Sequence, residues 1–189
     1  FRKINKIKKS DIILGFAGRY TEEKNINSLL FAFSKIIKEY DNVYLHMVGK
    51  NINNLNNDLI KYINDFRIKD KVFLLNEQKN LLKFYNGIDL LLLTSHSESF
   101  PNVVAEAMLC ATPVLSSDVG SSKKIIGDCG FIMNKNNNIT ILNNLKKFIV
   151  LFQYRKKEWK NLKKKSQIRI KKNFSIEKMS NQYLENWNL

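Results

Sequence analysis

Short apolar runs alternate along the chain with longer stretches in which apolar residues recur every three or four positions. Runs of about four to eight residues bounded by polar turns are typical of strands, whereas the longer spacing is typical of helices that bury one face. The run Ile88–Leu93 is almost entirely apolar, as expected for a parallel strand covered on both faces. The predicted strands are 11–17, 43–48, 72–75, 88–93, 113–116 and 130–133.

Helical spacing separates these strands. The segment 26–39, for example, puts Leu29, Leu30 and Phe33 on one face. The other helices predicted between strands are 55–66, 81–85 and 101–110.

From residue 139 onward only helical patterns appear, with a break before Ser175, which can cap the last helix. Strands that alternate with helices predict an α/β fold with a doubly wound parallel sheet of the Rossmann type. We therefore expect one Rossmann-like domain over 1–150 and a basic helical tail over 151–189.

Lysine and arginine outnumber acidic residues by 32 to 17, and the excess lies at the two ends of the chain. Residues 1–9 carry five basic residues and no acidic one, and residues 155–189 carry eleven against three. The intervening 10–154 is nearly balanced, with 16 against 14. This distribution favours a membrane surface, an anionic partner or plain solvation over a groove that follows nucleic acid. The basic stretch 154–172 is predicted to be an amphipathic helix on the domain, with contact to an anionic membrane as the alternative.

The two cysteines, Cys110 and Cys129, give neither a disulfide framework nor the spacing of metal ligands. Cys110 lies in an apolar helical stretch and is predicted to be a buried thiol in a reducing compartment. No run approaches the roughly 20 apolar residues of a membrane span, and no signal peptide is visible. The expected location is the cytoplasm, with peripheral contact to the inner face of the membrane through the tail. The sequence begins at Phe1, so we expect a piece of a longer protein.

Polar loops follow the first and the central predicted strands, and ligands of open parallel sheets bind outside such carboxyl ends. The first loop presents Gly18, Arg19 and Lys24 ahead of a helix, but it lacks the GxGxxG fingerprint of dinucleotide binding. A glycine that permits close approach and two cations suit a diphosphate. Exposed, solvated side chains are the alternative interpretation of this loop.

The second loop leads to two glutamates, Glu98 and Glu106, with Pro101 between them. Proline fits the first turn of a helix, so we predict that Glu98 lies in a loop and Glu106 lies inside the helix that follows. Solvated surface glutamates are the alternative. Amides in that first turn would have no intrahelical acceptor and would attract an anion. These are the amides of Asn102, Val103 and Val104.

The segment 98–106, Glu-Ser-Phe-Pro-Asn-Val-Val-Ala-Glu, resembles the E-x7-E motif of the retaining glycosyltransferases of family 4, which have the two-domain GT-B fold. Four further stretches resemble that family's first loop and helix, second strand, Glu-Ala-Met segment and closing helix. They are GFAGRYTEEKNINSLLFAF, LHMVGK, EAMLCATPVLSSDVGSS and NFSIEKMSNQYLENW. The similarity covers nearly the whole chain and matches the carboxyl-terminal, nucleotide-sugar-binding half of the fold.

The resemblance implies different roles for the charged residues. Glu98 would contact hydroxyls of the donor sugar near the reacting centre, and Glu106 would hold the ribose hydroxyls of the nucleotide. Arg19 and Lys24 would neutralise the diphosphate leaving group as the glycosidic bond breaks, which stabilises the transition state selectively. Neither a metal nor a cofactor is implied, because these cations and the helix terminus do that work.

The remaining implied donor contacts involve the backbone. Leu75 and Asn76, at the end of the third strand, would meet the base. Gly18 and the segment before and inside the helix would meet phosphate or sugar. The residues in that segment are Phe100, Asn102, Val103 and Val104.

Several positions depart from the family pattern. Ser99, Asn76 and Ala111 stand where glycine is usual, and Ser121 follows Gly120 where a second glycine is often found. Lysine at 124 replaces a frequent glutamate, which weakens the case for sugar or acceptor contacts there. None of these changes removes the four charged residues assigned above.

The two histidines are given no catalytic role. In the family, the histidine nearest the chemistry belongs to the amino-terminal domain. His96 is therefore interpreted as a loop or packing residue, and His46 as a structural residue inside a strand.

Together these features predict the donor-binding half of a retaining, metal-independent glycosyltransferase of the hexosyltransferase type. The resemblance implies a nucleotide-diphospho-sugar donor, with a UDP-sugar as the default, an absent amino-terminal acceptor domain and a role in cell-surface polysaccharide or glycolipid synthesis. This piece alone is expected to be inactive. One alternative is a nucleotide-sugar-binding module without turnover. Another is a basic α/β protein that binds nucleic acid, which the charge distribution and the lack of a basic, aromatic sheet motif disfavour.

Overall fold

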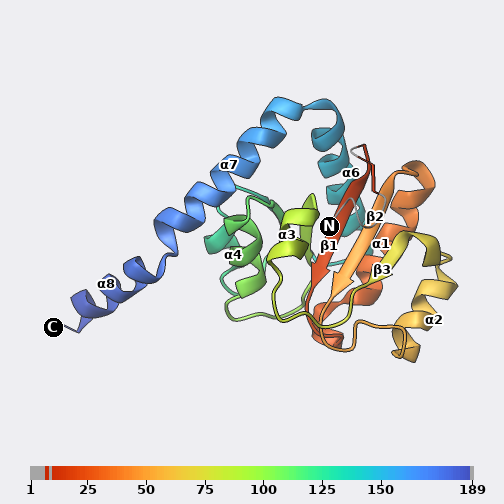
Figure 1. Cartoon of the computed structure of the whole chain (residues 1–189), viewed down its shortest axis with the longest axis horizontal. Helices are drawn as coiled ribbons and strands as arrows, with labels where there is room; N and C mark the ends of the chain where they lie inside the picture. The colour runs from red at the N-terminus through yellow and green to blue at the C-terminus, as the bar shows by residue number, and fades with distance from the viewer. Residues whose placement is uncertain (1–6, 9, 188–189) are drawn as a thin grey trace.

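Six strands lie side by side in one sheet, in the order β3-β2-β1-β4-β5-β6, in the computed structural model, which describes residues 7, 8 and 10–187 (Figure 1). All neighbouring strands are parallel. The order reverses between β1 and β4, as in the doubly wound Rossmann fold. The strands are β1 Ile12–Ala17, β2 Val43–Val48, β3 Val72–Leu74, β4 Leu90–Leu93, β5 Val114–Ser117 and β6 Phe131–Met133.

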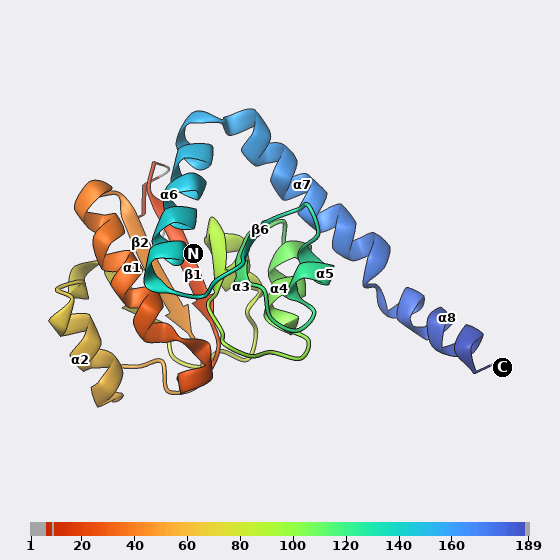
Figure 2. The same cartoon turned by 180° about the vertical axis from the view of Figure 1, so that it is seen from behind.

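Helices cover both faces of the sheet (Figures 1 and 2). The apolar faces of α1, α2 and α6 pack on one side, and those of α3, α4 and α5 pack on the other. The helices are α1 Ile26–Glu39, α2 Asn57–Asp65, α3 Leu82–Gly87, α4 Asn102–Leu109, α5 Ser122–Ile126, α6 Asn138–Tyr154, α7 Lys156–Asn173 and α8 Ile176–Asn186, with short 3-10 turns η1 Glu22–Lys24 and η2 Lys69–Lys71.

The central strand β1 shows why the sheet needs nearly continuous apolar runs. Ile12, Leu14 and Phe16 point into the layer that contains α1, whereas Ile13 and Ala17 point into the layer that contains α4. Every residue of β1 is buried. A strand covered on both faces cannot alternate polar and apolar residues, so its sequence loses the usual two-residue period.

The helix α7 is packed onto the domain over part of its length. Near its start, the ring of Trp159 lies 5.3 Å from that of Phe148 and 5.6 Å from that of Phe152, both on α6. Further along, the hydroxyl of Ser166 donates to the carbonyl oxygen of Cys129 at 2.8 Å, and Ile170 joins the apolar layer of α4. The last helix, α8, projects away from the domain (Figures 1 and 2).

The predicted fold class is confirmed, and most element boundaries differ by only a few residues. The strand predicted from residue 88 starts at Leu90, because the carboxylate of Asp89 accepts a hydrogen bond from the amide of Ile13 at 2.8 Å and ties the approach to β1. The stretch 117–130, expected to consist of turns, contains the short helix α5. The basic cluster predicted at the amino terminus falls largely on residues 1–6 and 9, outside the described residues.

Candidate active site at the edge between β1 and β4

The two polar loops singled out in the sequence meet at the carboxyl ends of β1 and β4, which are neighbours in the sheet. The hydroxyl of Thr94 donates to the carbonyl oxygen of Lys24 at 2.9 Å. The amide of His96 donates to the carbonyl oxygen of Glu23 at 2.7 Å. The loop after β1 and the loop after β4 therefore form one continuous surface where the strand order reverses, which is where open α/β sheets bind ligands.

The loop after β1 is held by a close backbone approach to the end of β2. The amide of Gly18 donates to the carbonyl oxygen of Val48 at 2.9 Å. Gly49 has a φ of +144°, and a Cβ atom there would lie 2.0 Å from the carbonyl oxygen of Gly18. Only glycine fits such a contact and conformation. Gly49 therefore shapes the loop that starts at Gly18, a dependence that the sequence pattern alone did not indicate.

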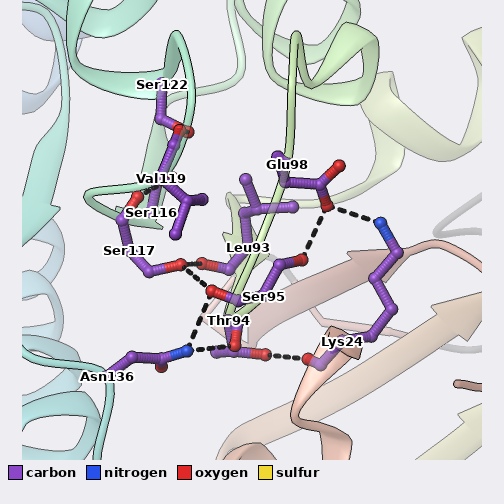
Figure 3. Close-up of polar contacts among 10 residues, drawn as sticks. All are labelled: Lys24, Leu93, Thr94, Ser95, Glu98, Ser116, Ser117, Val119, Ser122 and Asn136. Atoms are coloured by element: carbon purple, nitrogen blue, oxygen red, sulfur yellow. Dashed lines mark hydrogen bonds and ion pairs between the residues drawn. The ribbon is translucent and has the colours of Figure 1, made fainter. Parts of the chain in front are cut away.

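Lys24 and Glu98 form an ion pair across the two loops (Figure 3). The Lys24 Nζ atom lies 2.5 Å from Glu98 Oε1, and the hydroxyl of Ser95 donates to the same oxygen at 2.7 Å. The two side chains are only 19% and 15% exposed. The sequence assigned them to different parts of a donor, whereas the structure brings them together and makes each the partner of the other.

Arg19 differs from Lys24 in its surroundings. Its side chain is exposed and makes no ion pair with any residue that the structure describes. Its positive charge is therefore available to an incoming anion without the loss of an existing partner.

A buried polar network fixes the backbone beneath this pair (Figure 3). The amide nitrogen of Asn136, in the loop after β6, donates to the carbonyl oxygens of Thr94 and Ser95 at 2.5 and 2.9 Å. The hydroxyl of Ser117, at the end of β5, also donates to the carbonyl oxygen of Ser95 at 2.7 Å. Asn136 lies in an asparagine-rich stretch, where composition hid its special position.

The turn after β5 supports Glu98 from another side. The amide of Ser121 donates to the carbonyl oxygen of Ser99 at 3.0 Å. Gly120 has a φ of +50°, and a Cβ atom there would lie 2.1 Å from the carbonyl oxygen of Glu98 and 2.4 Å from that of Ser99. A larger residue at 120 would displace the backbone that carries Glu98.

The amino-terminal turn of α4 presents two free amides rather than the three that the sequence predicted. Pro101 is the N-cap, and the amide of Val104 donates to its carbonyl oxygen at 3.0 Å. The Val104 amide is therefore already used, because the first turn is tightened by an i to i−3 bond. Among the described residues, the amides of Asn102 and Val103 have no acceptor. Phe100 is 47% exposed, and its ring lies 6.3 Å from that of Phe174.

Glu106 lies inside α4, as predicted, and is exposed. Its Oε2 atom accepts a hydrogen bond of 2.7 Å from the hydroxyl of Tyr85 on α3. Burial raises the pKa of Tyr85, and the hydrogen bond to Glu106 raises it further, so the tyrosine stays protonated and remains a donor. Sequence reasoning missed Tyr85 because its position in the helix suggested only packing.

The end of β3 leaves little free backbone for a base. The amide of Leu75 donates to the carbonyl oxygen of Met47 at 2.9 Å, and the amide of Asn76 donates to that of Ile52 at 3.1 Å. Contacts from these two residues to a ligand would therefore use carbonyl oxygens. Asn76 has a φ of +58°, which explains why glycine would also suit this position.

The histidines and cysteines lie apart from these contacts. His46 is fully buried in β2, with its ring 4.8 Å from that of Phe73, and His96 is exposed in its loop. Cys110 is half-buried and Cys129 is buried, and both are free thiols. Within residues 7, 8 and 10–187, no three His, Cys, Asp or Glu side chains gather in a way that could hold a metal. Over the same residues, no helix has the length and apolar character needed to cross a membrane.

The fold and the matching structures define this chain as a GT-B type glycosyltransferase domain. A glycosyltransferase from Rickettsia africae matches 98% of this chain and 49% of its own, with a TM-score of 0.85 and 19% identity. Anabaena Alr3699/HepE, solved in complex with UDP-glucose, matches 99% of this chain and 51% of its own, with a TM-score of 0.84 and 19% identity. The model of the family "Glycosyl transferases group 1" matches residues 1–169, and the chain belongs to that family.

Curated relatives agree with this family. N-acetyl-alpha-D-glucosaminyl L-malate synthase of Bacillus anthracis is 31% identical over 128 residues, which are 67% of this chain and 33% of that protein. The capsular polysaccharide biosynthesis glycosyltransferase CapM of Staphylococcus aureus is 27% identical over 150 residues, 78% of this chain and 39% of that protein. The chain therefore spans about a third of the length of these relatives.

Proposed function

We propose that this chain is the donor-binding half of a retaining, metal-independent glycosyltransferase that uses a nucleotide-diphospho-sugar. The observation that carries the proposal is the edge between β1 and β4, where Arg19, Lys24, Glu98 and the free amides of α4 meet. Cations and helix amides suit a diphosphate, and a carboxylate beside them suits sugar hydroxyls. In this proposal the diphosphate takes over Lys24, and Glu98 turns to the sugar.

The donor we propose is a UDP-hexose. The support is by analogy, because the matching Anabaena protein was solved with UDP and with UDP-glucose. The role we propose for the whole protein is synthesis of a cell-surface polysaccharide or glycolipid, since one relative is named for capsular polysaccharide biosynthesis. The two free cysteines favour a reducing compartment, and we propose the cytoplasm.

The acceptor and part of the catalytic machinery would come from a facing amino-terminal domain. Two observations support this: the chain covers about half of the matching structures, and α8 presents Ile176, Tyr183, Leu184 and Trp187 to solvent. Proximity and orientation supply much of the rate of a group transfer. This piece alone is therefore expected to bind donor and to transfer essentially no sugar. A binding module without turnover is the competing hypothesis, and activity of the longer protein with an acceptor would exclude it.

The test is titration calorimetry with UDP in the presence of EDTA. We expect binding without metal, and Arg19→Ala should weaken it by about 1–3 kcal/mol, the range of charge-assisted hydrogen bonds. Lys61→Ala, an equally exposed cation on α2, is the matched control and should bind like wild type. Loss of binding on chelation, or equal affinities of the two variants, would overturn the diphosphate assignment.

A further inference from the structure

The outward side of α7 carries an unusual concentration of lysines. Exposed positions and buried positions separate cleanly on this helix, with Trp159, Ser166 and Ile170 on the buried side. The exposed positions span about half of the helix circumference. We call this half the lysine face; its members are Lys156, Lys157, Lys160, Lys164, Lys165, Lys171 and Lys172, with the half-exposed Ile168 among them.

The protein does not neutralise the lysine face. No lysine of this face forms an ion pair with any residue in the described part of the chain; the acidic residue of the same helix, Glu158, is held by Arg155 at 2.6 Å. Like charges four residues apart, such as Lys156 with Lys160 and Lys160 with Lys164, destabilise a helix by about 0.2–0.5 kcal/mol per pair. An external anionic surface would remove this repulsion.

We infer that the lysine face docks on the surface of a membrane that contains anionic lipids. The helix has 18 residues and is about 27 Å long, so it offers several cations to a flat surface at once. Each lysine near an anionic bilayer contributes about 1 kcal/mol. Ile168, 50% exposed among the lysines, adds an apolar side chain at the depth of the headgroups.

Lipid fits this face better than nucleic acid does. Its cations are all lysines, which act as point charges, and the helix's arginine, Arg169, donates to the carbonyl oxygens of Ile125 and Lys124 instead. Its aromatic residue, Trp159, is buried, so no ring on α7 can stack on bases. The face is also separate from the donor edge, since none of its lysines takes part in the contacts around Lys24 and Glu98.

The test is flotation with vesicles of phosphatidylcholine and of an equal mixture of phosphatidylcholine and phosphatidylglycerol, at low and at high salt. The chain should float only with the mixed vesicles, and salt should release it. Replacing Lys157, Lys160, Lys164 and Lys171 together by glutamine should lower the partition coefficient by about 100- to 1000-fold, because every 1.4 kcal/mol is tenfold.

The matched control replaces four exposed lysines elsewhere by glutamine, which changes the net charge equally. This control should keep most of the binding. Equal flotation of the two quadruple variants, flotation with neutral vesicles, or no flotation at low salt would each overturn the proposal. Tighter binding to an RNA or DNA oligonucleotide than to the mixed vesicles, lost in the α7 variant, would replace lipid by nucleic acid as the partner. The control residues are Lys61, Lys69, Lys79 and Lys83.

Discussion

The loop that carries Glu98 and the helix that carries Glu106 hold two glutamates eight residues apart in contrasting surroundings. Glu98 is largely buried and bound to a cation, Lys24, and to the hydroxyl of Ser95. Glu106 is exposed and bound to a neutral donor, Tyr85. A ligand that recruits Lys24 must first break an ion pair, whereas a ligand that reaches Glu106 finds a carboxylate that is oriented but not neutralised.

This contrast teaches that donor binding at one glutamate requires rearrangement and at the other does not. At the first, a diphosphate competes with Glu98 for the same ammonium group, so the affinity for the nucleotide is coupled to the charge of the carboxylate. At the second, the tyrosine hydroxyl can keep its bond while the other carboxylate oxygen meets a ribose hydroxyl.

The largest effect is expected from removing the shared cation. Lys24→Met should weaken UDP binding by about 2 kcal/mol, because a charge-assisted bond is lost and Glu98 is left as an unpaired anion near the diphosphate. Calorimetry with UDP and with UMP measures this. We expect a smaller loss for UMP, and an equal loss for both ligands would contradict the diphosphate role. Lys79→Met, an exposed lysine after β3, serves as the control.

A second variant tests the competition directly. Glu98→Gln removes the negative charge but keeps the shape, and it frees Lys24 for the diphosphate. UDP should bind more tightly by about 1 kcal/mol, or roughly fivefold, while turnover of the longer enzyme falls because the sugar contact is altered. Weaker UDP binding by this variant would show that the ion pair does not compete with the ligand.

Removing the neutral donor should have a smaller effect. Tyr85→Phe leaves Glu106 without its orienting bond, and we expect a loss of about 0.5–1 kcal/mol in nucleotide affinity. Because this carboxylate is assigned to the ribose, UDP and UMP should lose affinity by the same factor. A loss confined to UDP would move Glu106 to the diphosphate.

The smallest expected effect concerns the helix that carries Glu106 and not its carboxylate. Ala111 ends α4 with a φ of +56°, and the amide of Thr112 reaches back to the carbonyl oxygen of Ala107 at 2.9 Å. Glycine suits this conformation, so Ala111→Gly should raise the free energy of unfolding by about 0.5 kcal/mol after its greater flexibility in the unfolded chain is subtracted. Urea denaturation measures the gain, and UDP affinity should not change.

The fold could be predicted from the sequence because it follows from local patterns. Apolar runs such as Ile88–Leu93 and helical spacing such as 26–39 report burial directly. The proximity of the loops at Gly18 and Glu98 also followed, because the carboxyl ends of parallel strands share one edge. The sequence also placed Glu106 inside a helix from the position of Pro101 alone.

The contacts between distant residues could not be predicted in this way. Lys24 and Glu98 are 74 residues apart, and nothing local in either segment announces their ion pair. The same holds for Tyr85 with Glu106, and for Asn136, which reaches the backbone 42 residues earlier at Thr94. Even the Val104 amide was misjudged, because a tightened first turn depends on the exact backbone angles at Pro101 and not on residue type.

The hydrogen bonds of Asn136 have a consequence for attempts to transplant specificity. They join the loop after β6 to the loop after β4, and Thr94 joins that loop in turn to the loop after β1. Exchanging one of these loops for that of a relative would leave the other two without their partners. A chimera with a new donor preference would have to replace all three as a single cassette, together with the glycine at 120 that gives Glu98 its space.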